Sequence, residues 1–272
     1  MTQNEKAARF QALHQDREVL LFPNPWDGGS ARMLEQLGFQ ALATSSGACA
    51  ATFGRRDGKI SRAEALAHCR QMVAATDLPV AADLENGFAH EPAGVAETIR
   101  LAAEAGLVGG SVEDSSGDKD QPQYDLSLAV ERIAAAVEAA KALPFKFTLT
   151  ARAENFFRGK PDLSDTIERL TAYERAGADV LFAPALPDLA AVREVCAAVR
   201  KPVNFMVGIK GKSFSVAELT AAGVKRISFA SSLYRTAMTG MLSAAREIKT
   251  AGTFGYLENT LTTPQLNEFL RS

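Results

Sequence analysis

The chain repeats one pattern of hydrophobic and polar positions several times. An amphipathic segment rich in Ala, Leu, Glu and Arg ends in glycine, and a short apolar run follows, as in LEQLGFQALATSS (34–46) and YERAGADVLFAPA (173–185). Glycine is common directly after a helix because it readily adopts a positive φ. In a second pattern, proline leads into the apolar run, as in LPVAADLE (78–85), and proline is tolerated as a strand's first residue. The two patterns predict helices that alternate with short strands.

The apolar runs predict eight strands, at 19–22, 40–44, 79–83, 108–112, 146–150, 179–183, 203–206 and 226–229. The amphipathic segments predict helices at 28–37, 61–75, 92–105, 126–142, 164–176, 188–199, 214–222 and 233–250. Such alternation is typical of parallel βαβ units. Eight units in about 250 residues predict an α/β fold of the (β/α)8 TIM-barrel type. A doubly wound sheet is the alternative, and it is disfavoured because no GxGxxG follows the first strand.

The barrel is expected to form one domain over residues 1–272, with a C-terminal helical tail from about 251 to 272. In this tail the sequence predicts a turn and one further helix at 263–271. The longest polar stretch, DSSGDKDQPQYD at 114–125, follows the fourth strand. A long loop at this end of a barrel is expected to act as a lid.

Composition narrows the class of protein. Apolar residues make up 47% of the chain, enough for a large core, and a net charge of −2 excludes a basic field for nucleic acid or an anionic membrane. No apolar run is long enough to span a membrane, and the N-terminus lacks the apolar segment of a secretory signal. We therefore expect a cytoplasmic protein. Three scattered cysteines favour neither a zinc site nor a disulfide framework: Cys49, Cys69 and Cys196.

Polar side chains gather just after the predicted strands. In a parallel barrel these ends form the mouth that holds the active site. Asp83 and Glu85 lie two residues apart, which on a strand places both on one face, and Glu113 ends the neighbouring strand. Three carboxylates in one small cavity repel one another unless a cation lies among them. Oxygen ligands without His or Cys favour Mg²⁺, with Mn²⁺ as a second possibility. The alternative is that these residues are solvated loop residues or helix caps. Asp114 is expected to be a helix cap or an acceptor behind the ligands instead of a ligand.

Other residues at the same mouth suit a small anion. Arg152 directly follows the fifth strand, where a guanidinium could face the substrate, although a structural salt bridge is the alternative. Ser45, Ser46 and Gly47 form a small polar loop whose N–H groups could hold a carboxylate, and Asn204 lies on the seventh strand. No histidine is placed as an obvious base. His14 and His68 are expected at the surface, and Cys49 is expected to be either buried or reactive.

Several segments together resemble the isocitrate lyase/phosphoenolpyruvate mutase superfamily over residues 10 to 255. They are FPNPWDGGSARMLEQLGFQALATSSGACAATFGRRDG, VAADLENGF, GGSVEDSSG and TARAENFFRG. The resemblance implies a TIM barrel whose C-terminal helix is exchanged between the subunits of a homodimer or homotetramer. It also implies that Mg²⁺ binds near Asp83, Glu85 and Glu113 with Asp57 close by. The same resemblance assigns catalytic roles to Asp57, Glu113 and Arg152, and carboxylate binding to the loop 45–47.

The implied activity is a Mg²⁺-dependent carbon–carbon lyase acting on a small, oxaloacetate-like 2-oxo acid. Isocitrate and methylisocitrate lyases carry a Lys-Lys-Cys-Gly-His lid, whereas the corresponding segment 114–125 has neither Cys nor His, which disfavours isocitrate cleavage. The alternatives are phosphonomutase or phosphonate hydrolase chemistry on the same scaffold, and a protein that binds a 2-oxo acid without turning it over.

Overall fold

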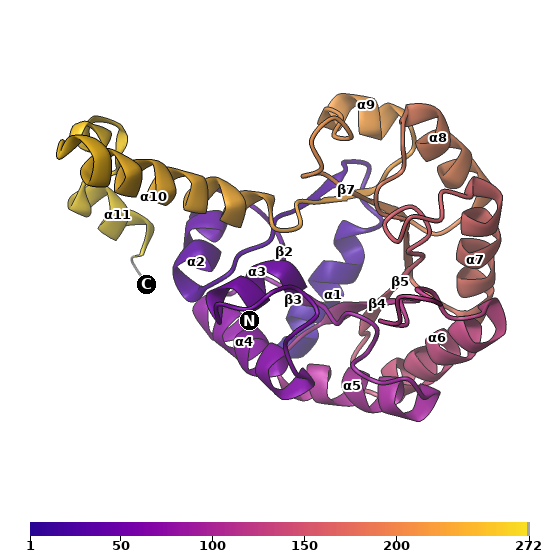
Figure 1. Ribbon diagram of the computed structural model, residues 1–272. Helices are drawn as coiled ribbons and strands as arrows, with labels where there is room; N and C mark the ends of the chain where they lie inside the picture. The colour runs from indigo at the N-terminus through magenta and orange to yellow at the C-terminus, as the bar shows by residue number, and fades with distance from the viewer. Residues whose placement is uncertain (271–272) are drawn as a thin grey trace.

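The structure, a computed structural model that describes residues 1–270, is a parallel barrel surrounded by helices (Figure 1). Its strands are β1 (Leu20–Phe22), β2 (Leu42–Ala43), β3 (Val80–Asp83), β4 (Gly109–Glu113), β5 (Thr148–Arg152), β6 (Val180–Phe182), β7 (Val203–Met206) and β8 (Arg226–Ser228). They pair in the order β1-β8-β7-β6-β5-β4-β3-β2, all parallel. Between β1 and β2 the described residues form no strand ladder. The Ala43 N–H bridges that gap by donating to the Pro23 carbonyl at 2.9 Å, so the barrel is nearly closed.

The helices that follow the strands are α2 (Gly28–Gln36), α4 (Arg62–Ala75), α5 (Pro92–Glu104), α6 (Leu126–Lys141), α7 (Leu163–Ala176), α8 (Leu189–Ala198), α9 (Val216–Ala221) and α10 (Ser232–Ala251). The predicted fold class is thus confirmed, with every predicted strand overlapping an observed one. The predicted glycine caps also hold, because Gly38, Gly106, Gly177 and Gly223 have φ values of 87°, 90°, 105° and 96°. The largest shift is in β5, which ends at Arg152 instead of residue 150 and so carries this arginine on the strand itself.

Two helices of the described chain were not predicted. The first, α1 (Gln3–Leu13), starts with a capping box at Thr2 and places fully buried Phe10 among the side chains that fill the barrel's lower interior. Gly109 makes room for this ring, since a Cβ there would lie 2.9 Å from Phe10 Cε1 and 2.8 Å from the Thr148 carbonyl oxygen. The second, α3 (Ser46–Thr52), begins where the sequence indicated a loop, with Ser45 as its N-cap. Phe10 thus fills the lower interior, while the cavity described below lies at the carboxyl ends of the strands.

The C-terminal part differs from a standard barrel helix. In α10 no residue is buried, and Figure 1 shows this helix leaving the barrel as an arm. A 3₁₀ turn, η1 (Gly255–Asn259), and the short helix α11 (Thr263–Phe269) complete the arm, which returns to α2 where Arg32 Nη1 donates to the Leu270 carbonyl at 3.1 Å. The extension thus starts near residue 232, earlier than the predicted 251, and residue 271 of the predicted last helix lies outside the described residues. In the described chain no helix is long and apolar enough to cross a bilayer.

The expectation that His14 and His68 lie at the surface was wrong, since both are buried. His68 Nε2 lies 2.8 Å from the Trp26 carbonyl oxygen. His14 Nδ1 lies 2.8 Å from the Phe10 carbonyl oxygen and must donate to it, which leaves Nε2 to accept from Arg226 Nη1 at 3.2 Å. Burial, followed by the charge of Arg226, lowers the pKa of His14 to about 3. A neutral histidine therefore links α1 to β8.

This burial predicts a pH-dependent stability. The unfolded chain takes up a proton at His14 near pH 6.5, while the folded protein does not until about pH 3. The folded state is therefore fully favoured above pH 7 and loses about 2 kcal/mol between pH 7 and pH 5 from this residue alone. Urea unfolding at both pH values measures the loss. In His14→Gln, which keeps a neutral acceptor, the pH dependence should shrink by that amount, and an unchanged dependence would contradict a buried neutral His14.

Candidate active site

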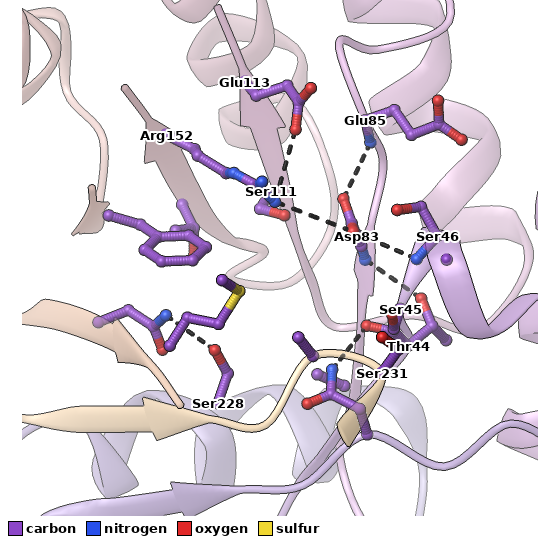
Figure 2. A pocket seen from close by; sticks show the side chains of 18 of the residues that line it. Thr44, Ser45, Ser46, Asp83, Glu85, Ser111, Glu113, Arg152, Ser228 and Ser231 are labelled. Carbon is purple, nitrogen blue, oxygen red and sulfur yellow. Dashed lines mark hydrogen bonds and ion pairs between the residues drawn. The ribbon is translucent and has the colours of Figure 1, made fainter. Parts of the chain in front are cut away.

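A cavity of about 340 Å³ opens at the carboxyl ends of the strands. Its lining includes every residue for which the sequence predicted a catalytic, substrate-binding or metal-binding role: Ser45, Ser46, Gly47, Asp57, Asp83, Glu85, Glu113, Arg152 and Asn204. Figure 2 shows Asp83, Glu85, Glu113 and Arg152 facing this space on one side and Ser228 and Ser231 on the other. Small strand residues, among them Ala43 and Ala81, let the cavity extend into the barrel. The structure thus brings the set together, while the roles remain predictions.

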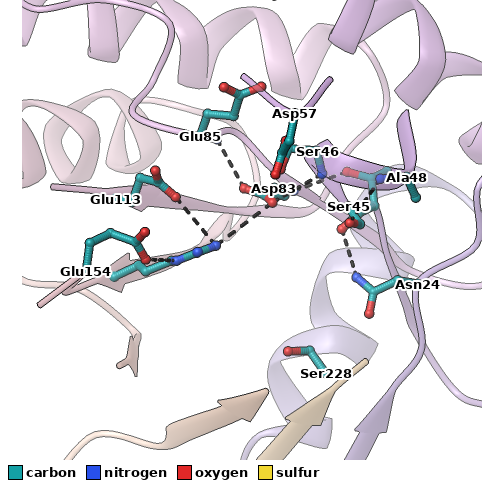
Figure 3. A network of polar contacts seen from close by, with 12 residues as sticks. Asn24, Ser45, Ser46, Ala48, Asp57, Asp83, Glu85, Glu113, Glu154 and Ser228 are labelled. Atoms are coloured by element: carbon teal, nitrogen blue, oxygen red, sulfur yellow. Dashed lines mark hydrogen bonds and ion pairs between the residues drawn. The ribbon is translucent and has the colours of Figure 1, made fainter. Parts of the chain in front are cut away.

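Asp83 is the last residue of β3 and lies at the centre of the group. Its Oδ2 accepts from the Ser46 N–H and its Oδ1 from the Glu85 N–H, each at 3.2 Å (Figure 3). The argument that placed Glu85 beside it was wrong, because the strand ends at Asp83, and the fully buried Leu84 that follows belongs to the main hydrophobic core. Glu85 has φ 49°, a left-handed conformation that non-glycine residues rarely adopt. This turn, instead of strand alternation, directs Glu85 to the cavity.

Arg152 and Glu113 are register partners on β5 and β4. Arg152 Nη1 lies 3.5 Å from Glu113 Oε2 and 4.0 Å from Asp83 Oδ2, and Arg152 Nε donates to the fully buried Glu154. Arg158 adds a second cation, with Nη2 at 3.0 Å from Glu113 Oε1 and Nε at 3.2 Å from Glu154 Oε2. The guanidinium of Arg152 also lies over the Phe182 ring at 5.0 Å, so its plane is held from several sides.

We call these groups the acidic cluster: five carboxyl groups with the two guanidinium groups of Arg152 and Arg158. The carboxyl groups belong to Asp57, Asp83, Glu85, Glu113 and Glu154. Burial, reinforced by Asp83 and Asp57, raises the pKa of Glu85 to about 7. Burial and then Glu154 raise the pKa of Glu113 to about 8, although Arg152 opposes the rise. Burial, aided by neighbouring carboxylates that the two guanidinium groups do not fully offset, therefore favours the protonated form of these two carboxyl groups.

The donor chemistry of the cluster fits a hydrated Mg²⁺. If all five carboxyl groups ionise against two guanidinium groups the cluster carries −3, and a divalent cation would reduce this to −1. All candidate ligands are oxygen atoms, the preference of Mg²⁺. Within residues 1–270, no three His, Cys, Asp or Glu side chains converge closely enough to hold a metal together. This arrangement suits an ion that keeps several waters and is held directly by few protein ligands.

The small polar loop of the sequence prediction is the start of α3. Ser45 Oγ accepts from the Ala48 N–H at 3.4 Å, while the N–H groups of a helix's first turn have no partner within the helix. Gly47 lets the Asp57 carboxylate approach closely, since a Cβ would lie 3.3 Å from Asp57 Oδ2. The resemblance implied that Asp57 lies close to the metal. In the structure Asp57 lines the cavity, and Figure 3 shows it between Glu85 and Ser46.

Asn204 lines the deeper part of the cavity, on β7. Its Oδ1 accepts from Arg226 Nε at 2.8 Å and its Nδ2 donates to Ser228 Oγ at 3.0 Å, so the amide orientation is set by these two neighbours. The sequence reasoning missed Arg158 and Arg226, both of which line the cavity. For Arg226 the sequence held a signal, an arginine inside an apolar strand. For Arg158 the signal was its position four residues after Glu154.

Asp114 is a structural acceptor, as predicted. Its carboxylate accepts from the Glu154 N–H at 2.9 Å, Arg169 Nη1 at 3.1 Å and the Tyr173 hydroxyl at 2.7 Å. The buried Gln123 amide adds a fourth hydrogen bond at 3.3 Å. This carboxylate therefore joins the start of loop 114–125 to α7 and to the residues that follow β5. Cys49, the cysteine expected to be either buried or reactive, is buried, and burial raises its pKa to about 11, which keeps the thiol protonated.

Replacing Asp114 should destabilise the protein without removing a cavity residue. Asp114→Asn removes the charge that pairs with buried Arg169 and should cost about 3 kcal/mol of unfolding free energy. Tyr173→Phe removes one neutral donor and should cost only about 1 kcal/mol. Denaturant titration of both variants provides the measurement. Equal losses in the two variants would show that the carboxylate charge is not what stabilises this region.

Comparisons with known proteins show the family of this chain. The family model described as phosphoenolpyruvate phosphomutase matches residues 10–249. A solved structure from Burkholderia cenocepacia J2315, described as a candidate lyase or mutase, is 50% identical with a TM-score of 0.97, covering 99% of this chain and 97% of that one. A second structure from the same organism, described as a candidate phosphonomutase, is 37% identical with a TM-score of 0.83, covering 90% and 99%.

Among curated proteins, "Probable 2-methylisocitrate lyase 2" of Corynebacterium glutamicum is 30% identical over 260 residues, 92% of this chain and 82% of that one. The chain belongs to the phosphoenolpyruvate mutase/isocitrate lyase superfamily, a class of lyases and mutases. The predicted resemblance is thereby confirmed. Members of this superfamily bind small 2-oxo acids and typically use Mg²⁺.

Proposed function

We propose that this protein is a Mg²⁺-dependent lyase that cleaves a carbon–carbon bond of a small, oxaloacetate-like 2-oxo acid. The observation that carries the proposal is the acidic cluster around Arg152, which is short of positive charge and lines a cavity large enough for such a molecule. Asp83 would hold the ion, with Asp57, Glu85 and Glu113 around it directly or through water. When bound, Mg²⁺ supplies Lewis-acid polarisation of the 2-oxo group.

The chain's own residues then position the substrate and its charge. Ser45, Ser46 and Gly47 at the start of α3 would bind the substrate carboxylate, although the Ser46 N–H already donates to Asp83 and the Ala48 N–H to Ser45. Arg152, fixed by Glu154 and Glu113, would place positive charge at the 2-oxo oxygen as negative charge develops there. Loop 114–125 would close over the cavity and exclude water. Loss of a terminal carboxylate as CO₂ would require no general base, which suits a cavity lined by no histidine among the described residues.

Phosphonate chemistry is the second candidate. The 37% identity to a candidate phosphonomutase favours it, whereas the similarity to a 2-methylisocitrate lyase favours carbon–carbon cleavage. A turnover panel that contains oxaloacetate, other 2-oxo acids and phosphonopyruvate separates the two. Tight Mg²⁺-dependent binding of oxalate without any product would instead support a binding protein.

Asp83→Ala should abolish Mg²⁺-dependent turnover while the protein remains folded. The substitution removes the central ligand and also relieves repulsion among the carboxylates, so the melting temperature should not fall. Oxaloacetate consumption at increasing Mg²⁺ concentration is the measurement, with circular dichroism as the folding check. Asp77→Ala, an exposed carboxylate remote from the cavity, is the control and should retain activity. Full activity of Asp83→Ala at saturating Mg²⁺ would reject the proposed metal site.

We also propose that residues 1–272 form one domain whose arm packs against a second copy of the chain. The arm exposes large apolar side chains along its length: Met241, Leu242, Ile248, Phe254, Leu257, Leu261 and Leu266. Such a concentration of exposed apolar area is typical of a protein–protein interface. The resemblance implies that a C-terminal helix is exchanged between subunits, so we propose that a second copy of the chain covers these side chains.

Light scattering after gel filtration should therefore give the mass of a dimer or tetramer. The double substitution Leu242→Glu and Ile248→Glu places charge on the apolar face of α10 and should shift the protein towards the monomer. Ser243→Glu adds one such charge at an exposed polar position of the helix and should leave the mass unchanged. A wild-type protein that elutes as a monomer at micromolar concentration would contradict the proposed exchange.

A further inference from the structure

Arg226 is a buried cation without an anionic partner. Only 4% of its surface is exposed, and its guanidinium lies over the Phe22 ring at 5.0 Å. Three neutral groups accept its hydrogen bonds: Asn204 Oδ1 at 2.8 Å, Thr150 Oγ1 at 2.9 Å and His14 Nε2 at 3.2 Å. Among residues 1–270, no carboxylate lies within ion-pair distance of it. A buried charge is normally paired, because desolvation without a counter-charge is costly.

The guanidinium retains hydrogen-bonding capacity. It carries five N–H donors, and the described residues accept from one on each of its three nitrogen atoms. One N–H on Nη1 and one on Nη2 are therefore left without a protein acceptor in the described chain. Two donors on one rigid plane suit the two oxygen atoms of a carboxylate.

The position of Arg226 relates it to the acidic cluster. Arg226 donates to Thr150, which precedes Arg152 by two residues on β5. The side chains of Thr150 and Arg152 therefore point to the same face of the strand, about 7 Å apart along it. Arg226 and Thr150 both line the cavity, next to the small residues Ala43 and Ala81 that leave space at this depth. Arg152 and the carboxylates that it contacts therefore lie near the mouth of the cavity. Arg226, which has no anionic partner, lies deeper, beside a residue two positions earlier on β5.

We propose that Arg226, with Thr150 and Asn204, forms a carboxylate subsite at the floor of the cavity, which selects a 2-oxo acid carrying a second carboxylate. This proposal rests on the proposed function, since the acidic cluster and Arg152 hold the 2-oxo end. A chain of four or five carbons places its second carboxylate within reach of a group one strand step away. His14 supports the subsite as a neutral acceptor that orients the guanidinium without cancelling its charge.

The test compares two ligands of equal length that differ only at the far end. 2-Oxoglutarate and 2-oxopentanoate both have five carbons, with a carboxylate or a methyl group at carbon five. Isothermal titration of the full-length protein with Mg²⁺ should show that 2-oxoglutarate binds at least about tenfold more tightly, as a charged hydrogen-bonded pair permits. Oxalate, which has no far end, is the internal control.

Arg226→Met should remove the preference between the two ligands while the affinity for oxalate changes by less than about threefold. Arg226→Lys, which retains charge without the planar fork, should keep part of the preference and serves if Arg226→Met fails to fold. Arg235→Met, at an exposed arginine of the cavity lining, is the matched control and should keep the whole preference. Equal binding of both ligands to a wild-type protein that binds oxalate overturns the subsite alone. A wild-type protein that binds neither oxalate nor 2-oxoglutarate overturns both the subsite and the proposed function.

Discussion

The contact of buried Arg152 with three carboxylates is the interaction on which the rest of the site depends. Asp83, Glu113 and Glu154 come from or directly follow three neighbouring strands, and only a cation between them lets them share one small volume. At an effective dielectric constant of about 20, each such contact near 4 Å is worth on the order of 4 kcal/mol. Desolvating each ion costs several kcal/mol in return. The attraction between these charges and the cost of desolvating them are therefore of similar size. Adding or removing one charge is enough to change which carboxyl groups are ionised.

The barrel supplies the rigidity that this balance requires. The register of β4 and β5 places Glu113 opposite Arg152, and Asp114 binds α7 and the backbone that follows β5. Below, Phe10 closes the lower interior, and above it Arg226 reaches across to β5. The buried charged side chains Glu113, Arg152 and Arg226 are thereby held by several contacts each, so a substrate meets a pre-oriented set of charges and little reorganisation is needed on binding.

Much of this arrangement could be predicted from the sequence. Apolar runs predicted all eight strands, because a buried parallel strand is marked in the sequence by a short continuous run of apolar residues. Asp83 and Glu113 followed from the rule that parallel strands end at one rim. Glu85 was assigned to the right cavity for the wrong reason, since a left-handed turn has no simple signature in a non-glycine residue. The burial of His14 could not be foreseen, because it depends on α1 meeting β8 across the whole chain, whereas the position of Arg226 inside an apolar strand was a signal that the sequence reasoning missed.

The arm illustrates the same limit. Its amphipathic pattern is identical in kind to that of a helix packed on the barrel, and periodicity alone does not say which surface an apolar face will meet. The sequence therefore predicted α10 as the eighth barrel helix, whereas the structure directs it away from the barrel (Figure 1). The resemblance, which implied a C-terminal helix that leaves its own barrel, was the better guide to the course of α10.

A crystal structure of the protein soaked with Mg²⁺ and oxalate tests the central claim most directly. The account predicts one octahedral ion bound by Asp83, with several waters in its shell, and oxalate bound to that ion and to the Arg152 guanidinium. An ion absent from the acidic cluster, or oxalate bound away from Arg152, would contradict it.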